Sequence, residues 1–136
     1  YRGIEDIFGN VWQCVDGINI KNNLIYINYN SETYAVDTFT GDYKPLGYVN
    51  AKANGYVKNL GYDPNNSLVS FPISVGGKET TYISDYYWQE SGNRIALVGS
   101  AWNSAGEQTG LWYWFCYHTA SSSSNSVIGS RLLRYQ

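Results

Sequence analysis

Short runs of β-branched and aromatic residues, separated by Gly, Asn and Pro turns, are the feature that most limits what this chain can fold into. Alternation of apolar with polar residues in such runs is typical of half-buried strands. The runs predict strands at 11–20, 23–29, 32–39, 93–102, 111–118 and 127–135, and an irregular aromatic strand or loop at 74–88. Residues 49–74 are expected to form loops, because turn residues interrupt each short apolar piece there.

A helix is expected at the N-terminus, where apolar residues recur on one helical face. The members of that face are Ile4, Ile7, Phe8, Val11, Trp12 and Val15. The turn dipeptide Gly9-Asn10 favours a short helix at 3–8 followed by a strand, and one longer helix that runs to Val15 is the alternative. The expected fold class is therefore α+β, with mostly short antiparallel strands, one or two helices and long ordered loops.

The length and composition suit a single domain with a binding surface. The 136 residues fit one core, and because Tyr1 lies within a pattern, residues 1–136 are expected to be the C-terminal part of a longer chain. The aromatic fraction is 17%, with 14 Tyr. Tyr supplies rigid contact area, and Ser, Asn and Gly supply adaptable hydrogen bonds, as in an antibody combining site. The alternative is that Tyr, Thr and Val are common because they suit strands.

The charge and hydropathy of the chain exclude some partners. The net charge is −2 and the nine basic residues are scattered, whereas a nucleic-acid-binding domain needs a basic stripe. No apolar run approaches the roughly 20 residues that span a bilayer. We therefore expect neither nucleic-acid binding nor membrane insertion.

The residue types give little support to catalysis. A Ser or Cys nucleophile needs a His base, and His118, two residues from Cys116, is the one histidine in the sequence. The sequence has no phosphate-binding glycine loop and no D-x-D-x-D-G calcium loop. The two cysteines, Cys14 and Cys116, have no spacing that demands a disulfide. We expect a protein that is not an enzyme and that uses no metal or other cofactor.

Three segments resemble a known family. GNVWQCVDG (9–17) resembles the GNVWEW segment of the formylglycine-generating-enzyme branch of C-type-lectin folds, and RIALVGSAW (94–102) resembles its Gly-Gly-Ser-Trp strand. IGSRLLR (128–134) resembles its closing G-F-R strand through Gly129 and Arg131. The order and spacing of the segments imply a C-type-lectin-like fold. The neighbouring cysteine pair of the enzymes and the EPN, QPD and WND triplets of calcium-dependent lectins have no counterpart in the sequence.

The chain is more similar to the variable proteins of diversity-generating retroelements and to related phage tail-tip domains. Those proteins begin like YRGIENFFGNVWKWVDGINI and end with a Gly-Ser-Trp strand, a Ser/Asn run and IGFRLL, a plan that this chain follows from Tyr1 to Leu133. The resemblance implies a domain that displays side chains on a rigid scaffold and binds a protein or glycan receptor on a bacterial surface. It implies a location on the phage virion or the cell surface, and it allows a homotrimer within a tail fibre.

In such systems, substitution at the adenines of Asn codons changes the displayed residues. The genetic code then allows Phe, Cys, Tyr, His, Ser, Asp and Val, but not Trp, Gln, Glu, Lys or Met. Applied to this chain, the rule predicts the display positions Asn103, Ser104, Tyr113, Phe115, Cys116, Tyr117, His118 and Val127. The predicted scaffold, buried beneath them, consists of Leu97, Trp102, Trp112 or Trp114, Ile128 and Leu132.

Alternatives remain open at this point. WYWFCYH (112–118) could be an aromatic strand over a core, with no display role. The domain could be a structural or decoration module without a variable ligand, or an enzyme or metal-dependent lectin. If binding lies elsewhere, the segment 78–92 with Tyr82, Tyr86 and Tyr87 is the next candidate.

Overall fold

The computed structural model describes residues 9–78, 80–104, 110–120 and 126–129, which form one sheet. The strands are β1 (Trp12–Lys21), β2 (Leu24–Ile27), β3 (Lys44–Pro45), β4 (Gly55–Leu60), β5 (Pro72–Val75), β6 (Tyr86–Gln89), β7 (Asn93–Gly99), β8 (Gly110–Cys116) and β9 (Ile128–Gly129). The helical segments within these residues are two 3-10 turns, η1 (Ser31–Thr33) and η2 (Pro64–Asn66), and Ala120 also has a 3-10 conformation.

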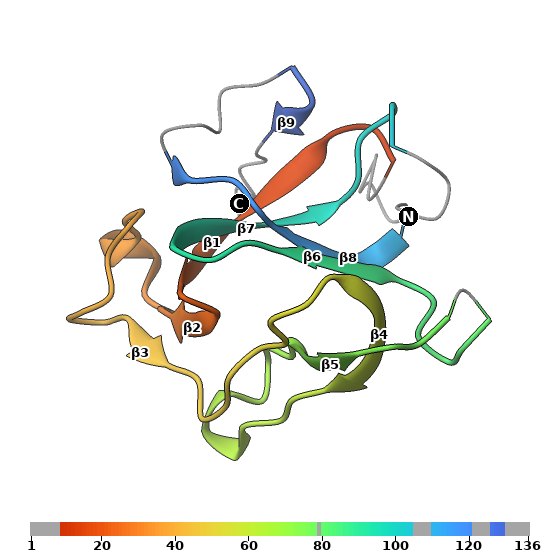
Figure 1. Cartoon of the computed structure of the whole chain (residues 1–136). Helices are drawn as coiled ribbons and strands as arrows, with labels where there is room; N and C mark the ends of the chain where they lie inside the picture. Colours follow the sequence, from red (N-terminus) through yellow and green to blue (C-terminus); the bar gives the residue numbers. More distant parts are fainter. Residues whose placement is uncertain (1–8, 79, 105–109, 121–125, 130–136) are drawn as a thin grey trace.

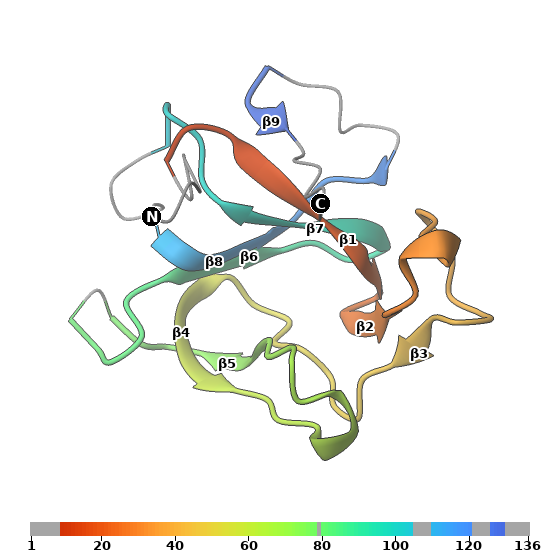
Figure 2. The same cartoon turned by 180° about the vertical axis from the view of Figure 1, so that it is seen from behind.

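The strand order in the sheet is β3-β2-β1-β7-β8-β6-β4-β5, and β9 also pairs with β1. β6 pairs with β8 in parallel, as does β1 with β9, and the other pairs are antiparallel. The sheet curls, so that β2–β3 and β4–β5 lie on the same side of the central strands and β9 lies on the other side (Figures 1 and 2). We call the concave side the inner face and the convex side the outer face.

Each face of the sheet has its own hydrophobic cluster. The inner core joins residues from both ends of the sheet: Ile18, Ile20, Ile25, Ile27, Leu46, Ala51, Val57, Phe71, Tyr87, Ala96 and Cys116. The outer cluster is smaller and consists of Trp12, Ile95, Leu97, Ala101 and Tyr113, with partly buried side chains around it. The central strands are therefore covered on both faces, as expected for strands rich in apolar residues.

β1 contributes to both faces because it bulges in its middle. Cys14 of β1 pairs with Leu97 of β7, and the next pair is Asn19 with Ile95. Between these two pairs the chain advances five residues in β1 but only two in β7, so the bulge in β1 contains three additional residues. An odd number of extra residues turns the alternate side chains onto the opposite face after the bulge.

The side chains of β1 follow this change of face. Trp12 belongs to the outer cluster, before the bulge, whereas Ile20 belongs to the inner core, after it. Gly17 lies in the bulge with φ +76°, and a Cβ there would lie 2.5 Å from the backbone oxygen of Asn28. This position therefore requires glycine, both for its backbone conformation and for the space available.

The expected α+β, C-type-lectin-like fold with one or two helices is wrong, because the described residues are almost entirely sheet and turns. The alternative helix to Val15 is also wrong, since residues 12–21 form β1. Pairing of β1 with β7 on one edge and with β2 and β9 on the other satisfies its backbone, which outweighs the helical spacing of its apolar residues. The expected helix at 3–8 lies outside the described residues.

Several strand predictions are confirmed and others are corrected. The strands expected at 11–20, 23–29, 93–102 and 111–118 correspond to β1, β2, β7 and β8, and β6 provides the aromatic strand near residue 88. The strand expected at 127–135 is confirmed at Ile128–Gly129, and residues 130–135 lie outside the described part of the chain. The strand expected at 32–39 is wrong, because Asn30 accepts a hydrogen bond from the Glu32 N–H and starts η1 instead. The loop expected at 49–74 contains β4 and the start of β5.

Candidate functional site

An aromatic hollow of about 410 Å³ opens on the outer face of the sheet. Its lining residues come from β1, β6, the segment after β7, and β8, and they are Trp12, Trp88, Asn103, Ser104, Tyr113, Phe115 and Tyr117. Pockets that hold small ligands have volumes of about 300–1,000 Å³ and walls that are mostly aromatic or aliphatic, with a few polar groups. The aromatic hollow meets both criteria.

β8 sets the spacing of the aromatic side chains. Tyr113 and Phe115 are two residues apart, so they share the outer face, and Tyr117 follows directly after the strand. Phe115 lies opposite Leu97 on β7 and opposite Trp88 on β6. β8 therefore has a pairing partner on each edge, which holds the backbone beneath the hollow in place.

The deepest part of the hollow is formed by rings that contact one another. Trp12 is 7% exposed and Tyr113 is 1% exposed. The Trp12 ring stacks on Phe115 with centroids 4.9 Å apart, and it meets Tyr113 edge-on at the same distance. Offset and edge-on ring pairs of this kind add about 0.5–1.5 kcal/mol each beyond area burial. These contacts make the floor of the hollow rigid.

The polar rim is formed by the turn that follows β7. Gly99 and Ser100 have φ values of +98° and +120°, and this backbone conformation turns the chain away from the strand. The Ser104 N–H donates to the Ala101 carbonyl, and the Ser104 hydroxyl accepts from the Ala101 N–H, which closes the turn. Asn103 is exposed at its tip. A non-glycine residue at φ +120° is strained, and such strain is concentrated at binding sites.

Arg94 places a positive charge beside the hollow. None of the lining residues carries a charged side chain. The Arg94 guanidinium lies 5.9 Å from the centroid of the Tyr117 ring. His118 contacts the rings of Phe115 and Tyr117, and burial, followed by the charge of Arg94, lowers its pKa. His118 is therefore neutral at physiological pH, and this end of the hollow repels cations.

The structure brings most of the predicted display positions together. Five of the eight line the hollow, namely Asn103, Ser104, Tyr113, Phe115 and Tyr117. His118 touches two of the aromatic rings that line it, and Val127 packs against the outer cluster. Cys116 points the other way, into the inner core, and burial raises its pKa. The buried thiol stays protonated and cannot act as a nucleophile.

The predicted scaffold is only partly where we expected it. Leu97 is fully buried, and Trp114 stacks on Phe71 with ring centroids 4.0 Å apart. Trp102 was expected to be buried but is 71% exposed, because its segment has already turned away from the sheet. Ile128 is half-buried beside the outer cluster. The side chains of Trp112 and Leu132 are outside the described part of the chain.

Two lining residues were not predicted from the sequence. Trp12 and Trp88 belong to strands that are distant from β8 in sequence, and only the strand order brings them beside Phe115. The alternative segment 78–92 is divided between two hollows: Trp88 lines the aromatic hollow, whereas Tyr82, Ile83, Ser84 and Asp85 line a separate apolar hollow on the inner face. Tyr87 is buried in the inner core, Tyr86 packs against the outer cluster, and Tyr82 is fully exposed.

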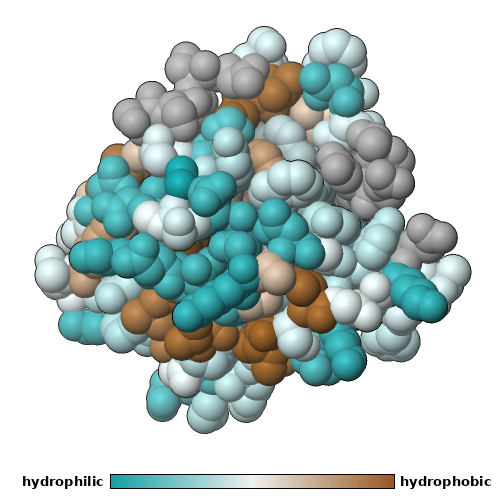
Figure 3. Space-filling model, viewed as in Figure 1, coloured by the Kyte–Doolittle hydropathy of each residue, from teal (hydrophilic) through white to brown (hydrophobic). Residues whose placement is uncertain are grey.

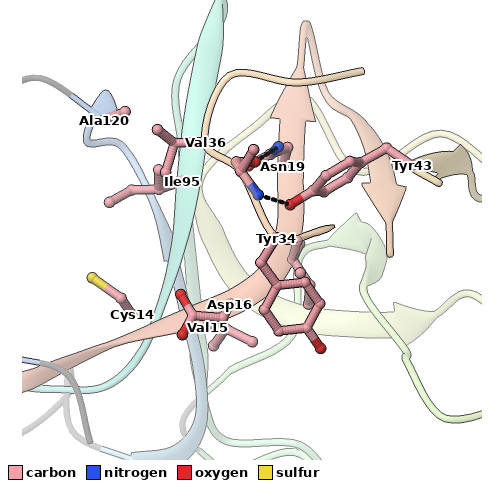
Figure 4. Close-up of a pocket in the computed structure, with 12 residues that line it drawn as sticks. Cys14, Val15, Asp16, Asn19, Tyr34, Val36, Tyr43, Ile95 and Ala120 are labelled. Carbon is pink, nitrogen blue, oxygen red and sulfur yellow. Dashed lines mark hydrogen bonds between the residues drawn. The ribbon is translucent and has the colours of Figure 1, made fainter. Parts of the chain in front are cut away.

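A second hollow, of about 300 Å³, lies where β1 bulges (Figure 4). The side-chain amide of Asn19 donates to the Ala35 carbonyl, and the Ala35 N–H donates to the Tyr43 hydroxyl, which holds the segment 34–36 beside the bulge. Burial and the charge of Asp16 raise the pKa of the Cys14 thiol, so it is a poor nucleophile at neutral pH. None of the predicted display positions lines this hollow.

A third hollow, of about 670 Å³, opens on the inner face between β1 and β4 and is mostly apolar. Hydrophobic residues gather in the region of β3, β4 and β5 on the face shown in Figure 3. Leu60 and Leu68, which line this hollow, are 44% and 86% exposed. Trp114 lines it from the inner face, but none of the predicted display positions does.

Other kinds of site find no support in the described residues. They contain no group of three or more His, Cys, Asp or Glu side chains that could hold a metal ion, and both cysteines are free. No helix in the same part of the chain is long and apolar enough to cross a membrane. No protein-family model, curated protein or solved structure matches this chain.

Proposed function

We propose that this domain is a non-enzymatic binding module that presents the aromatic hollow to a receptor on a bacterial surface. The observation that carries the proposal is the convergence of five predicted display positions on one hollow. The codon rule predicts those positions from the sequence, and it does not predict which of them lie close together in space. Two separate segments, 103–104 and 113–117, nevertheless supply them to the same place.

The physical properties of the hollow suit recognition. Tyr and Trp dominate binding hot spots, because they bury large areas with few rotatable bonds. The rings here are already held by contacts with one another, and Phe115 is additionally fixed on a paired strand. Binding to a preorganised surface costs little conformational entropy, so a few contacts can give useful affinity.

We also propose, from the resemblance to retroelement variable proteins, that the domain acts at a phage tail tip or on a cell surface and that its display residues are diversified. The gene neighbourhood tests this. A near-copy of the segment that encodes about residues 100–133, with adenines at the display positions, and a neighbouring reverse transcriptase are expected. Sibling sequences with identical residues at Phe115, Tyr117 and His118 would contradict diversification but not binding.

The test of binding uses labelled domain and a panel of bacterial cells. Wild type is expected to bind one or more strains, and the double substitution Phe115→Ala and Tyr117→Ala is expected to weaken binding at least about tenfold, as loss of aromatic hot spots does. Tyr62→Ala is the matched control, because Tyr62 is 73% exposed and does not line the hollow. Equal binding by wild type and the double variant would move the site elsewhere.

A structural or decoration module is the second candidate, favoured by the exposed apolar residues at the third hollow. Leu60 and Leu68, which are 44% and 86% exposed, line this mostly apolar hollow together, and contiguous exposed apolar surface marks contact surfaces between proteins. A domain that binds no cell but self-associates, and that loses association on Leu68→Ser, would favour this function over receptor binding.

A further inference from the structure

The size of the aromatic hollow limits what it can hold. A volume of about 410 Å³ suits a small ligand or one unit of a larger one. A stable protein partner covers about 800 Å² on each side, which is far more than such a hollow presents. The hollow is therefore suited to a compact group that enters it, rather than to a flat protein surface.

The charges of the described residues around the hollow disfavour other small ligands. Quaternary ammonium groups bind in cages of aromatic rings, but here Arg94 lies against the Tyr117 ring and no lining residue is a carboxylate. Nucleotides and other polyanions need several positive groups, and among the described residues we find only Arg94 at the edge of the hollow. A neutral ligand fits these charges best.

The polar groups of the hollow match hydroxyl groups. Asn103 offers an amide with two donors and one acceptor oxygen at the rim, and no side-chain hydrogen bond ties it to the described residues. Ser104 already accepts from the Ala101 N–H, which leaves its own hydroxyl hydrogen to donate. A ligand with both donors and acceptors on an apolar body would satisfy both side chains.

We propose that the aromatic hollow binds one pyranose ring of a neutral glycan. The C–H groups on one face of a pyranose carry partial positive charge and pack against the electron-rich faces of aromatic rings. Tyr117, which is 44% exposed, and the half-buried Trp88 supply such rings, and Asn103 with Ser104 at the rim takes the sugar hydroxyls. Phe115 stacks on both Trp12 and Tyr117 and so holds the Tyr117 ring in place. This inference rests on the binding function proposed above and names the ligand class of the same site.

The direct test is a titration of the domain with soluble neutral oligosaccharides of glucose, galactose, mannose and N-acetylglucosamine. Trp12 and Trp88 line the hollow, so binding is expected to change tryptophan emission with saturation. Asn103→Ala and Phe115→Ala should each weaken the saccharide at least about tenfold, whereas Tyr62→Ala should stay within about twofold. No emission change with any saccharide of the panel would overturn the proposal.

Treatment of the target cells separates the ligand class from the binding function. Periodate cleaves the vicinal diols of sugars, and proteinase removes surface proteins. Loss of domain binding after periodate, with binding retained after proteinase, is expected. Loss after proteinase alone, with Phe115→Ala still defective on untreated cells, would mean a protein receptor: the glycan proposal would then fail and the binding function would stand. Equal binding of Phe115→Ala and wild type to untreated cells would contradict both.

Discussion

The two faces of β8 differ in what surrounds their side chains. On the inner face, Trp114 stacks on Phe71 and Cys116 is 1% exposed. On the outer face, Phe115 is half-buried, and Tyr117, just after the strand, is 44% exposed beside the hollow. Neighbouring residues in a strand point to opposite faces, so one short segment can support the core and present a surface at the same time. The separation is clear at the end of the strand but not at Tyr113, which shares the outer face and is 1% exposed in the outer cluster.

The largest expected effect is the loss of inner-core packing. Phe71→Ala removes a fully buried ring from Trp114 and is expected to lower the free energy of unfolding by about 3–5 kcal/mol. Phe115→Ala on the outer face should cost only about 1–2 kcal/mol, because that ring is partly exposed. Urea denaturation of both variants measures the difference. Equal losses would mean that the two faces are equally important to the fold.

The second effect concerns the bulge through which β1 reaches both faces. Gly17→Ala places a Cβ 2.5 Å from the Asn28 oxygen at a positive φ, and is expected to cost about 2 kcal/mol or more. Gly41→Ala is the matched control, because Gly41 also has a positive φ but a Cβ there meets nothing within 4 Å. The control should lose only about 1 kcal/mol. Equal losses in thermal or urea unfolding would show that the crowding at the bulge is unimportant.

The sequence predicted the central strands well, because their apolar runs are strong enough to mark strands without knowledge of their partners. β4 and β5 were missed, since Gly, Asn and Pro around them resemble loop residues, and only pairing with neighbouring strands makes them regular. The strand expected at 32–39 failed for a local reason. Asn30 starts η1, and the Thr33 hydroxyl bonds to Asp42 at 2.6 Å, so side chains replace ladder partners.

The site was predictable where the information lay within one segment. Tyr113 and Phe115 followed from codon choice and alternate spacing, and both line the hollow. Cys116 failed the same rule, because codon choice does not say which face a residue occupies. Trp12 and Trp88 could not be placed at all, since their position depends on the order of strands in the sheet.

The third effect appears at alkaline pH and concerns Tyr113, which lies deepest in the hollow. Burial raises the pKa of Tyr113 above its value in the unfolded chain. The folded chain then keeps a proton that the unfolded chain releases, so the stabilisation is present at neutral pH and is lost as pH rises above about 10. Tyr113→Phe should reduce this loss by up to about 1.4 kcal/mol per pH unit. Unfolding by urea between pH 7 and 11 measures it, and identical pH curves for variant and wild type would contradict the buried state of Tyr113.

The smallest expected change in stability comes from Tyr117→Ser. It is compared with Cys116→Ser, which is the same replacement at the neighbouring residue on the other face of the sheet. Tyr117→Ser removes an exposed ring and should change the free energy of unfolding by about 1 kcal/mol or less, while binding falls at least about tenfold. Cys116→Ser places a hydroxyl in the inner core and should cost about 1–3 kcal/mol with little effect on binding by the folded fraction. Urea unfolding and cell binding of both variants give the four values. The codon rule allows serine at both positions. If Tyr117→Ser lost as much stability as Cys116→Ser, Tyr117 could not vary freely, and the hypothesis that this segment displays variable side chains would be contradicted.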